Sequence, residues 1–255
     1  MNAYSLTLVC LIGLFHLFYA VAVWRKDFSV IDICWGLGHL VPLYFSLTFS
    51  SHIELRQIFV SAIVFPWALR LSMYIHYRSI GKGEDHRYKK MRLGYGDKAN
   101  IKAYTNIFWL QTILLFVISL PILFINLSPE NDISYWDYAG FFISILGLLI
   151  ETIADWQKHK FKKSYPDKLV TTGLWKYSRH PNYFGECLVW WGVFLMSIGA
   201  QVWQWSLFSP LFLTFLILKV SGVSMLEKNY TNREGYDDYK RKTSSFIPWF
   251  PKELR

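Results

Sequence analysis

The chain has 255 residues, of which 53% are hydrophobic and 19% aromatic, and its mean hydropathy is +0.22. This composition excludes an ordinary soluble domain, which does not need so many long apolar runs. The chain carries 27 Lys and Arg residues against 18 Asp and Glu residues, a formal net charge of +9. No basic patch interleaved with aromatic residues lies outside the apolar runs. We therefore expect an integral membrane protein without a nucleic-acid partner.

Apolar runs of about 20 residues, the length that crosses the hydrocarbon of a bilayer, recur along the whole chain. They predict an all-α polytopic membrane protein with about seven transmembrane helices, at 5–23, 29–50, 57–77, 104–126, 136–156, 182–200 and 203–222. The first run lacks a following A-x-A-type cleavage site and is followed directly by Arg25 and Lys26, so we expect a retained span. One membrane domain over 1–255 is expected, with a four-helix half at 1–127 and a three-helix half at 128–255.

Basic residues mark one side of the predicted membrane protein. The loops after the first, third and fifth runs and the C-terminal tail are rich in Lys and Arg, whereas 128–137 carries Glu130, Asp132 and Asp137 and no cation. By the positive-inside rule the N-terminus lies outside and the C-terminus lies in the cytoplasm. We expect a multi-pass protein of the bacterial inner membrane, or of the endoplasmic reticulum if the source is eukaryotic.

The cysteines indicate neither a disulfide nor a metal site. Cys10, Cys34 and Cys187 all fall within predicted spans. Their spacing is not that of paired cysteines or of metal ligands. We therefore expect no bound metal.

The most informative segment is 173–186, which ends at 179–186 with Arg-His-Pro-Asn-Tyr-Phe-Gly-Glu. Pro181 suits the first turn of a helix, which places Asn182 and Glu186 four positions apart on one helical face. Arg179 and His180 then precede the helix N-terminus, where free N–H groups favour an anion such as phosphate. The alternative is a positively charged cap at the membrane interface, but that leaves the Glu186 carboxylate inside an apolar segment unexplained.

The fifth predicted span ends in a charged stripe. Glu151, Asp155, Lys158 and Lys162 share one helical face, with the acids deeper in the span than the bases. Two carboxylates below a basic cluster suit a dinucleotide, because acids accept from ribose hydroxyls and Lys binds phosphate. The alternative is structural, with the acids paired to neighbouring cations and the lysines reaching lipid headgroups.

Two further polar segments remain. The last span closes with Lys219 and Glu227 and is followed by a tyrosine-rich tail that includes Tyr239. Lys219 should reach an anion or the interface, and the tail is also a candidate for lying on the membrane surface. In the first half, the loop 81–88 has two glycines that allow a tight turn, followed by Glu-Asp-His-Arg-Tyr. These charges either cap a pocket or pair in water, and runs of mixed charge are more often solvated.

These motifs resemble the steroid 5α-reductase superfamily, and most closely its bacterial branch of uncharacterised membrane proteins. The segments that carry the resemblance are 29–36, 67–72, the Gly-Lys-Gly-Glu-Asp loop at 81–85, 179–186 and 220–223. Such enzymes are seven-helix membrane proteins that bind NADPH in a cavity facing the cytoplasm. Sterol C14-reductases share the Arg-His-Pro-Asn-Tyr stretch. Isoprenylcysteine and phospholipid methyltransferases have a related motif that contacts S-adenosylmethionine.

The resemblance implies an NADPH-dependent reductase of an activated carbon–carbon double bond in a lipophilic, steroid-like enone. The half 1–127 would then hold the substrate and 128–255 the cofactor. The expected cofactor-binding residues are Glu151, Asp155, Lys158, Lys162, Arg179, His180, Asn182, Tyr183, Glu186, Lys219, Glu227 and Tyr239. Asp32 and Trp35 are expected at the carbonyl end of the substrate, and Glu84, Asp85, Arg87 and Tyr88 at the substrate or its lid. For Asp32, the structural alternative is an ion pair with Arg25 or Arg70.

Two alternatives belong to other functional classes. One is a membrane methyltransferase that uses S-adenosylmethionine on a lipid or prenylated acceptor, and the other is a non-catalytic lipid-binding membrane protein. The expected partners are a lipophilic small molecule and membrane lipids, without an obligate protein partner. The reductase hypothesis requires Asp155, Asn182, Glu186 and Lys219 to line one cavity, although they come from three predicted helices.

Overall fold

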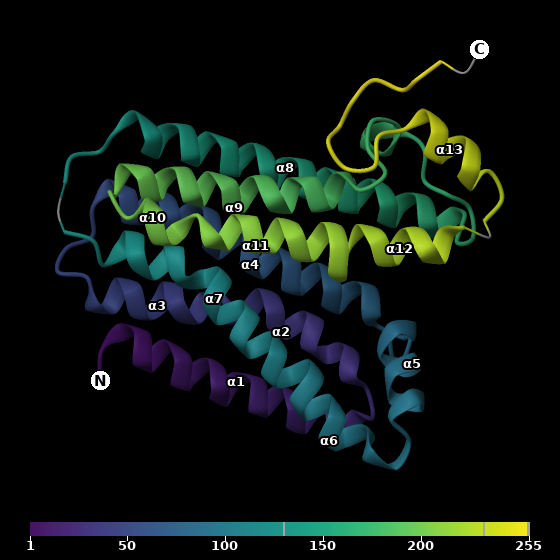
Figure 1. Ribbon diagram of the computed structural model, residues 1–255, viewed down its shortest axis with the longest axis horizontal. Helices are drawn as coiled ribbons and strands as arrows, with labels where there is room; N and C mark the ends of the chain where they lie inside the picture. Colours follow the sequence, from purple (N-terminus) through teal and green to yellow (C-terminus); the bar gives the residue numbers. More distant parts are fainter. Residues whose placement is uncertain (130, 232, 254–255) are drawn as a thin grey trace. The chain divides into compact units, whose positions relative to one another are not determined.

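The computed structural model of the chain describes residues 1–129, 131–231 and 233–253. Over these residues the regular secondary structure is helical, apart from one isolated β-bridge between the backbones of Ser178 and Ser244. The chain forms two compact units (Figure 1). The first comprises Met1–Ile133 with Ala200–Val202, and the second comprises Ser134–Gly199 with Trp203–Arg255. The first boundary between the units thus lies a few residues after the expected division at 127.

The described chain contains six helical segments that are long and apolar enough to cross a membrane. They are Ala3–Arg25, Phe28–Phe49, Leu55–Ser79, His86–Asn126, Tyr135–Ser164 and Trp203–Lys228. These segments confirm an all-α, multi-pass integral membrane protein. The other expected span, 182–200, is the helix α9 (Pro181–Gly199), which has 19 residues. Its first turns carry Asn182, Tyr183 and Glu186, which lower its mean hydropathy below that of the six segments.

The first unit is built from seven α-helices joined by short turns. They are α1 (Ala3–Arg25), α2 (Ile31–Gly38), α3 (Leu40–Phe49), α4 (Leu55–Ser79), α5 (His86–Tyr95), α6 (Ala99–Ala103) and α7 (Leu110–Asn126). The 3-10 turns are η1 (Phe28–Val30) and η2 (Gly96–Lys98), and a π-helical turn, η3 (Tyr104–Trp109), leads into α7. The core of this unit includes Leu11, Phe15, Phe28 and Leu115. A Cβ at Gly36 would lie 2.6 Å from the Ala68 carbonyl oxygen, so glycine is required for the close packing of α2 on α4.

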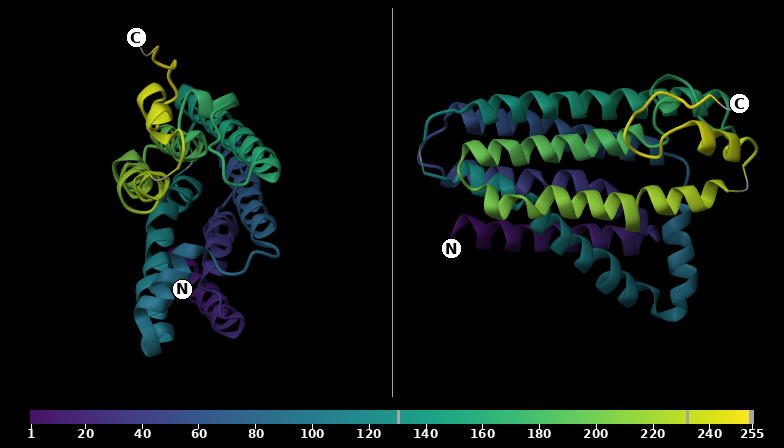
Figure 2. Two further views of the ribbon diagram at one scale, coloured as in Figure 1. Left: turned by 90° about the vertical axis from the view of Figure 1, so that its right-hand side faces the viewer. Right: turned by 45° about the horizontal axis from the view of Figure 1, so that its top comes forward.

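The second unit contains the helix pair that positions the candidate site. Its helices are α8 (Tyr135–Ser164), α9, α10 (Trp203–Ser206), α11 (Phe208–Phe215), α12 (Val223–Tyr230) and α13 (Tyr236–Lys242), with the turns η4 (Gly173–Lys176) and η5 (Leu216–Val220). Within this unit α8, α9 and α11 run side by side (Figures 1 and 2). The segment after α13 returns to the residues that precede α9.

Glycines seven positions apart allow α8 and α9 to pack closely in antiparallel directions. Gly140 and Gly147 of α8 face Gly192 and Gly185 of α9. A Cβ at Gly147 would lie 2.6 Å from the Gly185 carbonyl oxygen, and a Cβ at Gly185 would lie 2.6 Å from the Glu151 backbone nitrogen. Small residues let the backbones of membrane helices approach in this way. The glycines therefore fix which turn of α8 meets the start of α9.

Candidate functional site

The packing of α8 on α9 brings the predicted acids to the Arg-His-Pro-Asn motif. Glu151 and Asp155 are buried, with 2% and 5% of their surface exposed. Asn182 Nδ2 donates a hydrogen bond of 3.2 Å to Asp155 Oδ1. The Oδ1 atom of Asn182 is also buried, yet it accepts no hydrogen bond from the described residues. The structure thus confirms that the charged stripe of α8 and the start of α9 meet, and it leaves one amide oxygen available to a donor.

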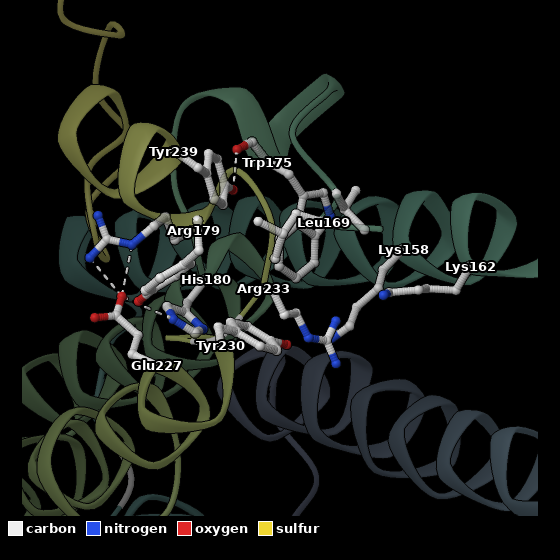
Figure 3. Close-up of a pocket in the computed structure, with 12 residues that line it drawn as sticks. Lys158, Lys162, Leu169, Trp175, Arg179, His180, Glu227, Tyr230, Arg233 and Tyr239 are labelled. Carbon is white, nitrogen blue, oxygen red and sulfur yellow. Dashed lines mark hydrogen bonds and ion pairs between the residues drawn. The ribbon is translucent and has the colours of Figure 1, made fainter. Parts of the chain in front are cut away.

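A pocket lies nearby, between the end of α8, the residues before α9 and the region of α12 and α13 (Figure 3). Its lining residues are Lys158, Lys162, Leu169, Val170, Trp175, Arg179, His180, Glu227, Tyr230, Arg233, Tyr236 and Tyr239. Six of the expected cofactor residues are among them. The enclosed space is about 20 Å³, which holds roughly one water molecule. The side chains therefore nearly fill the pocket in this conformation.

Arg179 is bound on two sides by other parts of the second unit. Its Nε and Nη2 atoms contact Glu227 Oε1 at 2.8 and 2.6 Å. Its Nη1 atom donates to the carbonyl oxygens of Lys240 and Thr243 at 3.1 and 2.6 Å. The sequence predicted a phosphate-binding cation here. In the structure the same guanidinium joins the start of α9 to α12 and to the chain around α13.

His180 is a buried histidine beside this ion pair. Its ring stacks on Tyr183, with centroids 5.8 Å apart and planes 13° apart. The Nε2 atom lies 3.5 Å from Glu227 Oε1, at the outer limit of a hydrogen bond. Burial lowers the pKa of His180, and the positive charges of Lys158 and Arg179 act in the same direction and together outweigh the effect of Glu227. We therefore expect a neutral imidazole at neutral pH.

Three cations gather on another side of the pocket (Figure 3). Lys158 and Lys162 come from the end of α8, and Lys162 lies close enough to Lys158 and to Arg233 to be affected by both positive charges. Lys158 Nζ lies 5.1 Å from the centre of the Trp175 ring, and the Arg233 guanidinium carbon lies 4.7 Å from that of Tyr230. Cations next to aromatic faces suit an anionic ligand that also has flat rings.

The C-terminal segment forms one wall of the pocket. The Tyr239 hydroxyl donates to the Trp175 carbonyl oxygen at 2.6 Å, and the Trp249 backbone nitrogen donates to the Tyr177 carbonyl oxygen at 2.9 Å. Burial raises the pKa of Tyr239, so its hydroxyl stays protonated and can donate. The tail was also predicted to lie on the membrane surface. The contacts of residues 236–249 with the segment that precedes α9 are compatible with that position.

Lys219 and Glu186 are two of the six expected cofactor residues that lie outside the pocket lining. Lys219 is exposed on η5, where the chain follows a π-helical course. A π-helical turn shifts the phase of the residues in it, so α-helical periodicity cannot predict the direction of Lys219. Glu186 is half-buried one turn into α9. None of Asp155, Asn182, Glu186 and Lys219, which the reductase hypothesis places around one cavity, is among the residues that line this pocket.

In the first unit, Asp32 is held by the loop that was expected to form a lid. Its carboxylate accepts hydrogen bonds from Arg87 Nη2 at 2.7 Å and from the Tyr88 hydroxyl at 2.5 Å. The ion pair that Asp32 makes is with Arg87, a residue other than the expected alternatives Arg25 and Arg70. These contacts give Asp32 a role in holding the loop, and its expected role at a substrate carbonyl stays a prediction.

The other charges of this loop are partly buried. Glu84 is paired with Arg92 at 2.5 Å and accepts from the Phe28 backbone nitrogen at 2.9 Å. Asp85 caps α5 and contacts Arg87 Nε at 2.9 Å. Although burial raises the pKa of Asp85, the hydrogen bonds and charge of Arg87 lower it below its usual value. A loop solvated on all sides is therefore wrong, because the loop is anchored to the residues before α2.

Trp35 takes part in aromatic packing. Its half-buried ring lies 5.8 Å from the ring of His39, which lies 5.1 Å from the ring of Trp67 on α4. Trp35 also packs against the core of the first unit. These contacts explain the residue structurally, and a role toward substrate stays a prediction.

Sequence reasoning missed several aromatic and basic residues of the pocket. Trp175 precedes the Arg-His-Pro-Asn motif by a few positions, and its Nε1 atom donates to the Ala154 carbonyl oxygen at 3.0 Å. Tyr230 ends α12, Tyr236 begins α13, and Arg233 lies between the two helices. Their pocket role depends on the fold of the tail, which has no local sequence signal.

Comparison with known proteins assigns the chain to a family whose function is unknown. Residues 18–243 match the family described as "Protein of unknown function (DUF1295)". An uncharacterized protein of Schizosaccharomyces pombe is 26% identical over 227 residues, which cover 76% of this chain and 65% of the relative. This chain thus spans 65% of the length of that relative. No solved structure matches this chain. Because the family match includes both the Asp32 cluster and the whole pocket lining, the chain belongs to the DUF1295 family of unknown function.

Proposed function

We propose that the protein is a membrane-embedded, NADPH-dependent reductase of an activated carbon–carbon double bond in a lipophilic, steroid-like enone. One observation carries this proposal: cations from α8 and from the segment after α12 meet beside the Arg-His-Pro-Asn motif in one pocket. The resemblance of that motif to steroid 5α-reductases supports a nicotinamide cofactor. The apolar helices support a substrate that enters from lipid.

The chemistry of the pocket residues fits a phosphate-bearing dinucleotide. Lys158, Lys162 and Arg233 would bind phosphates through charge-assisted hydrogen bonds. Asn182 lies outside the pocket lining, so its buried Oδ1 atom would accept from an amide or hydroxyl of the ligand only after the pocket opens, while Asp155 holds the Asn182 amide in place. NADPH, when bound, supplies hydride. The role of the chain is to position the two reactants and to provide electrostatic stabilisation.

The size of the pocket adds a condition to this proposal. Its enclosed space of about 20 Å³ is far below the several hundred Å³ of a typical ligand site. A dinucleotide therefore requires the wall formed by Tyr230, Arg233 and Tyr236 to move outward. Once closed again, the same aromatic wall would exclude water from the bound ligand.

We also propose that this end of the second unit faces the cytoplasm, in a bacterial inner membrane or in the endoplasmic reticulum. The last turns of α8 and α13 carry Lys162, Lys163, Lys240, Arg241 and Lys242. Such a concentration of cations favours the cytoplasmic side. A cytoplasmic pocket has direct access to soluble nucleotides.

A methyltransferase that uses S-adenosylmethionine is the second candidate, and Glu227 favours it. The Glu227 carboxylate lines the pocket next to Arg179 and His180. A carboxylate repels phosphate but attracts an amino group, and S-adenosylmethionine has an amino group and no phosphate. The two candidates therefore differ in which charged groups of the pocket contact the ligand.

Ligand binding by the purified full chain in lipid nanodiscs tests the proposal. NADPH, NADH and S-adenosylmethionine would each be titrated at one salt concentration, with isothermal calorimetry as the readout. A Lys158→Ala/Lys162→Ala double variant should weaken NADPH binding at least about tenfold, because each charge-assisted contact contributes roughly 1.5–3 kcal/mol. Lys160→Ala is the matched control, since Lys160 lies on the same helix but is exposed and outside the pocket lining.

Turnover completes the test. Adding a lipophilic enone to the NADPH-bound protein should oxidise the NADPH. The loss of the near-ultraviolet absorbance of NADPH measures this reaction. Binding of S-adenosylmethionine without NADPH would favour the methyltransferase. Binding of neither would leave the non-catalytic lipid-binding alternative.

A further inference from the structure

The second unit carries an exposed apolar patch on its C-terminal segment. We call residues 244–252 the strap. Ile247, Trp249 and Phe250 of the strap are 61%, 70% and 76% exposed. Aromatic side chains with this exposure at the end of a membrane-spanning helix bundle are typical of groups that enter the headgroup region of a bilayer.

The strap is held in a fixed place although its apolar side chains are exposed. The Trp249 backbone nitrogen donates to the Tyr177 carbonyl oxygen at 2.9 Å, and the Lys252 backbone nitrogen donates to the Lys242 carbonyl oxygen at the same distance. The Phe250 ring lies 6.1 Å from the Tyr177 ring, edge to face. The exposed side chains of the patch are therefore held by an ordered backbone and do not belong to a frayed chain end.

Cations surround the patch. Three exposed lysines lie near it: Lys176, Lys242 and Lys252. Lys252 belongs to the strap and is bonded to Lys242, and the Lys176 ammonium lies 6.0 Å from the centre of the Tyr177 ring. Glu253, the residue after the strap, is an exposed acid. Asp238 on α13 is also acidic, but its charge is paired with Arg241. The surroundings of the patch thus carry a net positive charge that is complementary to an anionic surface.

We infer that the strap docks on the anionic headgroup surface of the membrane that holds the helices. The strap is bonded to the residues directly before α9, and the turn that precedes these residues contacts α8 at Ala154 and Gln157, where the apolar part of α8 gives way to its basic end. We take this to be the level at which the helix leaves the hydrocarbon. Ile247, Trp249 and Phe250 enter the interface, and Lys242 and Lys252 contact lipid phosphates. This inference does not depend on the proposed reductase activity.

Fluorescence of a label on the strap tests the inference. Phe250→Cys would be labelled with an environment-sensitive dye in a Cys10→Ser background, because Cys10 is exposed whereas Cys34 and Cys187 are buried. The full chain would be placed in neutral nanodiscs and in nanodiscs with about 30% anionic lipid. The readout is quenching by acrylamide, a neutral quencher whose concentration the membrane charge does not change.

Quenching should be at least about threefold weaker in the anionic discs, because each lysine near an anionic surface shifts an equilibrium about fivefold. Lys242→Glu/Lys252→Glu should remove that difference, while Lys163→Glu/Lys168→Glu, which changes two exposed lysines in and after the last turn of α8, should keep it. Equal quenching in both lipids would overturn the inference. Protection that appears only with two copies per disc would also overturn it, because a second chain would then be the occupant.

Discussion

Gly185→Ala should separate α8 from α9 and destabilise the second unit. The added Cβ would lie 2.6 Å from both the Glu151 backbone nitrogen and the Gly147 carbonyl oxygen, whereas ordinary contacts begin near 3.4 Å. Both opposing atoms belong to backbone, so a helix has to move by almost the whole difference. Overpacking of this kind costs about 1–3 kcal/mol, and the better helix propensity of Ala returns up to about 1 kcal/mol. We expect a net loss of about 1–2 kcal/mol.

Thermal unfolding in detergent measures this loss, with Gly13→Ala as the matched control. Gly13 is also inside a helix, but a Cβ there meets nothing within 4 Å, so the control should gain stability from helix propensity alone. The melting temperature of Gly185→Ala should fall by about 2–8 °C, while that of Gly13→Ala should stay level or rise. If both variants changed by the same amount and in the same direction, the close-packed glycines would not be what fixes the register of α8 and α9.

Three further predictions concern the pocket. Glu227→Gln should lower the melting temperature, because buried Arg179 loses its charged partner. The same variant should raise the affinity for NADPH, because it removes a negative charge from the pocket. A fall in NADPH affinity would instead indicate that Glu227 binds the ligand. Because burial lowers the pKa of His180, the unfolded chain binds that proton more readily, so stability should fall as the pH drops below about 6.5. His180→Gln should flatten this part of the pH–melting profile, and an unchanged profile would contradict the assignment. NADPH should bind at least about tenfold more tightly than NADH if Lys158 and Lys162 contact its extra phosphate, and equal affinities at one salt concentration would argue against it.

Hydrophobic run length predicted the helices well and their ends less well. The run 136–156 became α8, which continues to Ser164 because a helix does not have to stop where its side chains become charged. The run 29–50 became η1, α2 and α3, with a break at His39 that hydropathy does not record. The run 104–126 begins in the π-helical turn η3. Composition fixes where a chain is apolar, while backbone hydrogen bonding decides how each helix ends.

The candidate site was predictable where its residues share a helical face or belong to a recognisable motif. Asn182 and Asp155 were expected near one ligand, and the structure brings them together because glycine spacing sets the helix register. Asp32 and Arg87 are far apart in the sequence, and no local pattern identifies such a pair. The fold of the tail against the residues before α9 is equally nonlocal. Pairs of this type depend on tertiary packing, which a single sequence does not reveal.

The structure divides the basic residues of the pocket into two kinds, and the division bears on how an anion would bind. Arg179 is satisfied by Glu227 and by two carbonyl oxygens, so an anion gains from it only by displacing a carboxylate. Lys162 is held instead by the carbonyl oxygens of Pro166 and Lys168, at 2.7 Å each, and it is repelled by the positive charges of Lys158 and Arg233. An anion between these three relieves that repulsion at once. We therefore expect a phosphate to contact the lysines and Arg233 first, with the Arg179–Glu227 pair keeping the wall of the pocket in place.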